Sequence, residues 1–222
     1  MRFRILLLAT TVFCIYSTST TAQIKDSMSY SMGLQIATSM DEGGILKDFD
    51  VDAFAQAFKD VKAKKPKLTT EQAEEFLRNY FANMQNREAA KAKEEGKAFL
   101  DKNANEPGVI TLPSGLQYKI VNAGTGTKPS ETDNVEVHYK GTLLNGDVFD
   151  SSYDREETVT FPLNRVIPGW TEGLQYIAEG GKIILYVPSD LAYGDMGHPP
   201  VIPAGSTLVF EIELIKVSPP EM

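Results

Sequence analysis

The sequence predicts an α+β protein: an all-helical N-terminal region, a long linking helix, and a C-terminal antiparallel half-barrel wrapped on one short helix. Two observations lead to this prediction. From residue 26 to about residue 105, apolar side chains recur with the three- to four-residue spacing of amphipathic helices. After that point, short segments alternate apolar and polar residues with period two, separated by Gly, Pro and Asn. Strands that wrap around one short helix form such a half-barrel.

The start of the chain has the features of an export signal. Arg2 and Arg4 form a basic start, residues 5–16 an apolar core, and Thr20-Thr21-Ala22 a small-residue cleavage site. The apolar run is shorter than the ~20 residues that a membrane-spanning helix needs. We therefore expect residues 1–22 to be a cleavable signal peptide.

Cysteine content and charge exclude several classes of function. Cys14 is the only cysteine and lies inside the expected signal, so cleavage would leave neither a disulfide nor a reactive thiol. Lipidation of Cys14 is the poorer alternative, because the bulky Phe13 stands where a small residue is expected. The net charge of −8, without a basic stripe, argues against binding to nucleic acid.

Three helices are expected in the N-terminal region. In the first, Met or Ile recurs every fourth position over residues 28–40. Asp50 is placed to cap the second, whose apolar face spans residues 51–61. Thr69 and Gln72 form a capping box that begins the third.

The third helix is expected to continue over about residues 70–102 as the linking helix. Residues 85–98 include no large apolar side chain, but Ala, Glu, Lys and Arg are good helix formers. Lys91 and Glu95 have the i,i+4 spacing of an ion pair. We therefore expect a solvated helix with Gly96 as its weak point, and a disordered charged linker is the alternative.

The apolar faces of these helices predict self-association. A small three-helix unit cannot bury three apolar stripes internally, so pairing with a second copy is the natural solution. A Met-rich stripe also suits a promiscuous binding surface, but at helical spacing it is more often core. We expect a homodimer, and a fragment that begins near Gly108 should be monomeric and active.

Four segments of the C-terminal region are expected to be strands. Three alternate with period two, and residues 182–187 form a more continuous apolar run that suits a buried strand. The strands span residues 115–121, 134–139, 182–187 and 207–217. Residues 169–178 form the short helical segment.

Six short motifs stand at the turns and strand ends of this region. They are VHYKG at residues 137–141, FDSS at 149–152, VIPGW at 166–170, AYG at 192–194, GHP at 197–199 and TLVFEIEL at 207–214. Over residues 114–217, these motifs in this order resemble the FKBP-type peptidyl-prolyl cis–trans isomerases. Residues 26–105, with SYSMG at 29–33, are similar to the macrophage infectivity potentiator (Mip) subgroup.

The resemblance implies a domain order and a location. The expected segments are a signal peptide at 1–22, a helical dimerisation domain at 23–88, a linking helix and linker at 89–113, an FKBP-type isomerase domain at 114–217, and a tail at 218–222. Together with the signal, the subgroup implies the periplasm, with outer-membrane association left open. A eukaryotic secretory lumen is the alternative, although the C-terminus is not a retention signal.

The implied reaction is rotation about X–Pro peptide bonds. Its barrier is about 18–20 kcal/mol because resonance makes the C–N bond partly double, and no bond has to break. An apolar site that removes water from the carbonyl destabilises the planar, more polar ground state. Aromatic and branched walls are therefore the expected signature, rather than acid–base residues.

By resemblance, nine residues form the pocket, and each of the apolar ones alone would also fit a core. They are Tyr139, Phe149, Asp150, Val166, Ile167, Trp170, Tyr193, Ile202 and Phe210. Trp170 would be the floor, while the Ile167 N–H and the Tyr193 hydroxyl would hydrogen-bond substrate carbonyls. Asp150 would line the pocket as a carboxylate paired with Arg155.

The chain departs from the family pattern near the pocket. Val159 stands where an aromatic wall residue is common, so a shallower or wider pocket is expected there. Asp195, Met196 and Pro200 alter the rim loop, which leaves substrate preference and inhibitor affinity open. His138 is expected to be structural.

The expected partners follow from the resemblance. They are proline-containing unfolded or nascent exported polypeptides, a second copy of the chain, and tacrolimus-type macrolide inhibitors. No cofactor and no metal are expected, since the chain has two His and its single Cys lies in the signal. A non-catalytic chaperone that grips unfolded chains and a dedicated small-ligand receptor remain the alternative functions.

Overall fold

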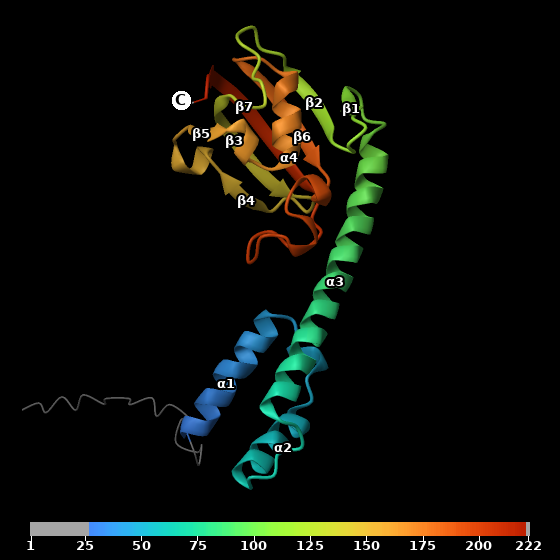
Figure 1. Cartoon of the computed structure of the whole chain (residues 1–222), viewed down its shortest axis with the longest axis vertical. Coiled ribbons are helices and arrows are strands. Elements are labelled where there is room, and N and C mark those ends of the chain that lie inside the picture. Colours follow the sequence, from blue (N-terminus) through green and yellow to red (C-terminus); the bar gives the residue numbers. More distant parts are fainter. Residues whose placement is uncertain (1–26, 221–222) are drawn as a thin grey trace, which may run out of the picture. The chain divides into compact units, whose positions relative to one another are not determined.

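The structure, a computed structural model, describes residues 27–220 (Figure 1). The expected signal peptide at residues 1–22, with Cys14, lies outside the described residues. The chain divides into two compact units, the first ending at Thr69 and the second beginning at Thr70. Within residues 27–220, the structure has no helix with the length and apolar character that crossing a membrane requires.

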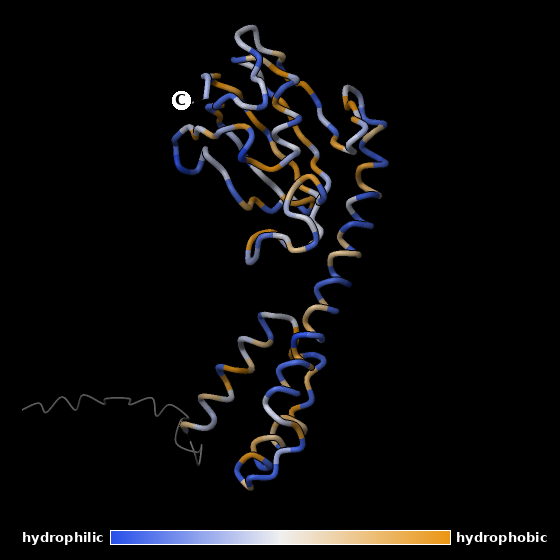
Figure 2. The backbone as a smooth tube through the Cα atoms, in the orientation of Figure 1, coloured by the Kyte–Doolittle hydropathy of each residue, from blue (hydrophilic) through white to orange (hydrophobic). Residues whose placement is uncertain are grey.

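The first unit consists of helices with exposed apolar faces. It contains α1 (Ser27–Glu42), the 3₁₀ turn η2 (Leu46–Asp48) and α2 (Val51–Lys62). The expected cap of α2 is confirmed, since the Asp50 carboxylate accepts a 2.9 Å hydrogen bond from the Ala53 N–H. Hydrophobic residues recur along both helices (Figure 2). Neither helix has a buried residue, so their apolar stripes lack the cover that a core would give them.

The second unit begins with α3 (Thr70–Asn103), which confirms the expected long helix. Its first turns also expose large apolar side chains, with Phe76 66% and Leu77 50% exposed. The expected ion pair between Lys91 and Glu95 is present, at 3.7 Å.

The second half of α3 is docked rather than solvated, so that part of the expectation is wrong. Ala89, Gly96 and Asn103 are buried, and their spacing of seven residues places them on one face of the helix. A Cβ on Gly96 would lie 2.2 Å from Thr207 Oγ1, which shows how closely the helix approaches the sheet domain. Asn103 donates a 2.8 Å hydrogen bond to the Gln117 side chain. Gly96 is therefore a packing position, and small side chains make this contact.

The rest of the unit is a twisted antiparallel sheet. Its strands are β1 (Val109–Thr111), β2 (Gln117–Asn122), β3 (Asn134–Leu143), β4 (Val148–Ser151), β5 (Val159–Pro162), β6 (Gly181–Val187) and β7 (Leu208–Ser218). They are ordered β1-β2-β6-β7-β3-β4, and β5 pairs with β3. Each of the four expected strands has a counterpart, and the expectation lacked the short strands β1, β4 and β5.

The short helix α4 (Pro168–Gly173), extended by η5 (Leu174–Tyr176), packs on the sheet against β6. Trp170, Leu174 and Ile177 are at most 4% exposed and join the inward-facing residues of β3, β6 and β7 in one core. Figure 1 shows α4 lying across the strands. The α+β prediction is confirmed, with strands wrapped on one short helix.

The connections beside the core are short 3₁₀ turns. They are η3 (Tyr153–Arg155), η4 (Leu163–Arg165), η6 (Ser189–Leu191) and η7 (Gly194–Met196). The last two lie in the loop between β6 and β7, on either side of Ala192 and Tyr193.

Candidate active site

A cavity of about 530 Å³ opens beside the start of α4. It is lined by Tyr139, Phe149, Asp150, Phe161, Arg165, Val166, Ile167, Pro168, Trp170, Ala192, Tyr193 and Phe210. Eight of the nine expected site residues therefore lie together. The ninth, Ile202, is 2% exposed and belongs to the hydrophobic core rather than to the lining.

Aromatic rings meet edge to face around Trp170 at the base of the cavity. The Trp170 ring centroid lies 5.2 Å from those of Tyr139 and Phe210 and 5.8 Å from that of Phe161. Gly141 on β3 is needed beside this group, because a Cβ there would lie 2.5 Å from the Phe149 ring. The rings thus form a rigid apolar floor whose geometry is favourable for aromatic pairs.

Four lining residues were not expected from the sequence: Phe161, Arg165, Pro168 and Ala192. Phe161 matters most, because it supplies an aromatic wall two residues after Val159. The two residues share one face of β5, since side chains on a strand alternate. This alternation along the strand is the sequence feature that could have identified Phe161 as a wall residue. Val159 itself packs against the core.

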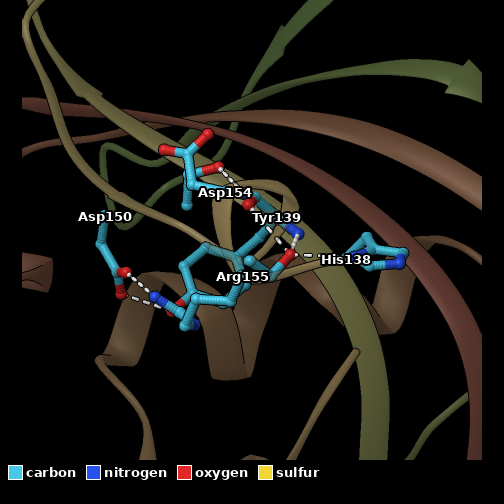
Figure 3. A network of polar contacts seen from close by, with 7 residues as sticks. His138, Tyr139, Asp150, Asp154 and Arg155 are labelled. Carbon is cyan, nitrogen blue, oxygen red and sulfur yellow. Dashed lines mark hydrogen bonds and ion pairs between the residues drawn. The ribbon is translucent and has the colours of Figure 1, made fainter. Parts of the chain in front are cut away.

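Three polar side chains form a closed network at one wall of the cavity (Figure 3). Arg155 Nη1 lies 2.6 Å from Asp150 Oδ1, which confirms the expected pair, and Arg155 Nη2 donates to the Tyr139 hydroxyl at 3.1 Å. The Tyr139 hydroxyl in turn donates to Asp150 Oδ2. The guanidinium carbon is also 5.9 Å from the centre of the Tyr139 ring.

This network fixes the protonation states of its members. Burial would raise the pKa of the Asp150 carboxyl, but the hydrogen bonds from Arg155 and Tyr139 outweigh it, and the net pKa is lowered. Burial, together with the hydrogen bond to Asp150, raises the pKa of Tyr139. Asp150 is therefore ionised and Tyr139 protonated at neutral pH, and neither is poised to exchange a proton with a substrate.

Several hydrogen-bond donors of the lining have no partner within residues 27–220, among them the Arg165 guanidinium, the Ile167 N–H and the Tyr193 hydroxyl. The Ile167 N–H points from the residue before α4, whose own carbonyl accepts from Trp170 and Thr171 at 2.9 and 3.2 Å. The Tyr193 hydroxyl lies on a side chain that is 38% exposed. Partial burial, and to a lesser extent the charge of Asp150, raises the pKa of Tyr193, so its hydroxyl stays a donor at neutral pH.

Near the site, His138 has a structural role and the Trp170 indole nitrogen is unpaired. His138 Nδ1 lies 3.0 Å from Ser152 Oγ, and its ring stacks on Tyr153 with centroids 4.8 Å apart. The Trp170 indole nitrogen is buried and, within the described chain, has no hydrogen-bond partner. Residues 27–220 contain no cluster of His, Cys, Asp and Glu suited to a metal ion.

Comparison with known proteins identifies the family. Residues 125–215 match the family "FKBP-type peptidyl-prolyl cis-trans isomerase", and residues 25–120 match the "domain amino terminal to FKBP-type peptidyl-prolyl isomerase". A probable FKBP-type isomerase, FkpA of Neisseria meningitidis, is 44% identical over 204 residues, covering 87% of this chain and 74% of its own length. The chain belongs to the FKBP-type peptidyl-prolyl cis–trans isomerases.

Further relatives support the similarity of this FKBP-type isomerase to the Mip subgroup. The "outer membrane protein MIP" of Legionella longbeachae is 40% identical, with 87% of this chain and 85% of that protein covered. Among solved structures, FkpA from Escherichia coli superposes with a TM-score of 0.69 at 39% identity, covering 89% of this chain and all of that one. The similarity to Escherichia coli FkpA therefore includes the N-terminal helices as well as the FKBP-type sheet domain.

Proposed function

We propose that this isomerase accelerates rotation about X–Pro bonds in unfolded exported polypeptides, with the prolyl ring seated on Trp170. The observation that carries the proposal is an aromatic cavity whose unpaired donors include the Ile167 N–H and the Tyr193 hydroxyl. A cavity of about 530 Å³ accommodates a prolyl residue and its flanking peptide groups.

The aromatic walls lower the barrier by excluding water from the reacting amide. The planar amide is more polar than the twisted one, so an apolar site disfavours the ground state. A hydrogen bond to the reacting carbonyl would strengthen its resonance and oppose the twist. The Ile167 N–H is therefore assigned to a carbonyl that flanks the reacting amide, where binding energy holds the substrate in place. Tyr193 binds a second substrate carbonyl.

Removing the Ile167 N–H tests this assignment without disturbing the fold. Ile167 has φ −59° and ψ 145°, which proline also adopts, and its N–H makes no internal hydrogen bond in the described chain. We expect Ile167→Pro to lose about three- to tenfold in kcat/KM relative to Ile167→Ala, the worth of one ordinary hydrogen bond at about 0.5–1.5 kcal/mol. The assay is isomerisation of a proline-containing peptide, with circular dichroism as the fold control.

Equal rates for the proline and alanine variants would exclude the Ile167 N–H from substrate binding. Wild-type rates no faster than the uncatalysed peptide would refute the isomerase itself. A tacrolimus-type macrolide, proposed to bind the same cavity, should compete with the peptide and protect Tyr193 from solvent.

We also propose a homodimer, joined through residues 23–88, with residues 89–113 as the link to the isomerase domain at 114–217. The support lies in exposed apolar side chains on the three N-terminal helices: Met28 is 68%, Phe58 63% and Phe76 66% exposed. Exposed apolar side chains on each of these helices indicate association surfaces. Sedimentation of the mature protein as a monomer at micromolar concentration would contradict this arrangement.

The proposed location is the periplasm, with outer-membrane association as the alternative. Its support is the export signal at residues 1–22 and the relative named as an outer membrane protein. Sequencing of the protein from fractionated cells should find Gln23 at its N-terminus. Protein recovered from cytosol with Met1 intact would refute it.

A chaperone role is the second candidate, favoured by the same exposed methionine and phenylalanine side chains. A fragment of residues 26–105 should then suppress the aggregation of a client protein that contains no proline. If suppression requires residues 114–217, the isomerase domain alone accounts for binding to unfolded chains.

A further inference from the structure

Contacts from α3 reach the loop that carries Tyr193. In this loop, η6 and η7 lie on either side of Ala192 and Tyr193, and both of these residues line the cavity. The Lys93 ammonium lies 2.8 Å from a carboxylate oxygen of Asp190, in η6, and 2.6 Å from one of Asp195, in η7. One lysine of the long helix thus joins the two turns that flank Tyr193.

The helix backbone fixes the position from which Lys93 reaches this loop. Ala89, one turn earlier, is 2% exposed, and a Cβ on Gly205 would lie 2.4 Å from the Ala89 carbonyl oxygen. The Gly205 N–H donates a 3.0 Å hydrogen bond to the carbonyl of Gly194, the residue after Tyr193. Because backbone atoms make these contacts, α3 has little freedom to shift along the sheet domain.

The positions of the Asp190 and Asp195 carboxylates depend on the Lys93 ammonium that lies between them. Their side chains are 76% and 62% exposed, whereas that of Lys93 is 35% exposed. Hydrogen bonds to Asp190 and Asp195 raise the pKa of Lys93, so the ammonium stays charged at neutral pH. Without it, the carboxylates would repel each other, and η6 and η7 would lose their common attachment to α3.

We propose that Lys93 is a positioning residue for isomerisation: it holds η6 and η7 so that the Tyr193 hydroxyl stays at the mouth of the cavity. This inference rests on the role proposed above for Tyr193. It makes α3 part of the catalytic unit, although the residues that line the cavity come from the chain between Tyr139 and Phe210.

Substitution of Lys93 in the full-length mature protein tests the proposal. Lys93→Met should lower kcat/KM for a proline peptide about three- to fivefold, equivalent to ~0.7–1 kcal/mol. Lys93→Arg, which retains the charge, should restore most of the rate. The matched control is Lys97→Met, four residues along the same helix, because Lys97 pairs with Asp101 of α3 itself at 2.5 Å. We expect wild-type turnover from that control.

A double variant distinguishes two ways in which Lys93 could act: as a clamp that holds η6 and η7 in place, or through the electrostatic field of its charge in the cavity. If Lys93 acted through its charge on the cavity, Asp190→Asn with Asp195→Asn would change the rate in the opposite direction. A clamp predicts a loss of the same sign and size, with no further loss when Lys93→Met is added. Opposite signs, or fully additive losses, would overturn the proposal.

Tyr193→Phe shows whether Lys93 acts through Tyr193. In that background, Lys93→Met should cost nothing more, whereas a general loss of structure would still lower the rate. If Tyr193→Phe alone keeps wild-type activity, the substrate-binding role of Tyr193 is wrong. If Tyr193→Phe is impaired and Lys93→Met is not, the clamp alone is overturned and the proposed function stands.

Discussion

Replacing Gly96 with alanine distinguishes a docked helix from a solvated one by the sign of the stability change. In a solvated helix the substitution stabilises by about 0.8–1.0 kcal/mol, because glycine loses more backbone entropy on folding. In this structure the new Cβ would lie 2.2 Å from Thr207 Oγ1 and 3.1 Å from Thr207 Cβ. Thr207 is 5% exposed, and rotation of its hydroxyl leaves the Cβ contact in place. The helix or the residues at the start of β7 must therefore shift.

Overpacking of a close contact costs about 1–3 kcal/mol. With ~2 kcal/mol for the contact and ~1 kcal/mol returned by helix propensity, we expect Gly96→Ala to lower the free energy of unfolding by about 1 kcal/mol. For a chain of this size that corresponds to a fall in Tm of about 2–4 °C. Urea and thermal unfolding followed by circular dichroism measure both quantities.

A shorter side chain at Thr207, which relieves the contact with a Cβ at position 96, supplies the control. In a Thr207→Ala background the hydroxyl is gone, so the same Gly96→Ala change should cost less than in the wild type, and the two substitutions should not be additive. A stabilisation of about 1 kcal/mol by Gly96→Ala in the wild type would refute the docking of α3 and restore the solvated helix.

Three further predictions concern the site and the assembly. The pKa of Asp150 is lowered, so its carboxylate stabilises the fold fully above the usual Asp pKa, and this stabilisation is lost as pH falls through the lowered pKa. The stability difference between wild type and Asp150→Asn, under ~1 kcal/mol for so exposed a group, should therefore persist at neutral pH and shrink in urea unfolding only at pH values below the usual Asp pKa. A fragment that begins at Asn83 should sediment as a monomer and keep full turnover of a proline peptide. A fragment that begins at Gly108 lacks Lys93 and should be monomeric but slower. Equal rates for the two fragments would contradict a role for α3 in catalysis. Trp170→Phe should cost about 1–3 kcal/mol of stability and lower turnover, and an unchanged rate would show that the indole is not the seat of the prolyl ring.

The sequence predicted those features whose signal is local or carried by large side chains. The Asp50 cap, the length of α3 and the longer strands follow from capping chemistry and from periodicity. The docking face of α3 could not be recognised in this way, because Ala89 and Gly96 contribute almost no hydrophobicity. Their seven-residue spacing can be recognised as a docking face only in the folded chain, where Gly205 and Thr207 lie against them.

The residues that the motifs mark lie together around one cavity, whereas residues whose position depends on a turn or on strand pairing could not be placed from the sequence. Ile202 was grouped with the walls, but hydrogen bonds in both directions between Ile202 and His198 turn that segment so that the Ile202 side chain enters the core. Phe161 lies in no motif, and its role depends on the pairing of β5 with β3, which brings its ring to Tyr139 and Trp170.

The pattern of satisfied and unsatisfied polar groups matches what rotation about an amide requires. A hydrogen-bond donor or cation facing the carbonyl oxygen of the reacting amide would favour its polar, planar form. Asp150, the carboxylate of the lining, is instead neutralised by Arg155 and occupied by the Tyr139 hydroxyl. Donors are left open at Ile167 and Tyr193, where a flanking peptide group can be held. Since Tyr193 sits on a loop and a loop is a poor support for a precise contact, the ion pairs from Lys93 to either side of it supply the rigidity that the sheet does not.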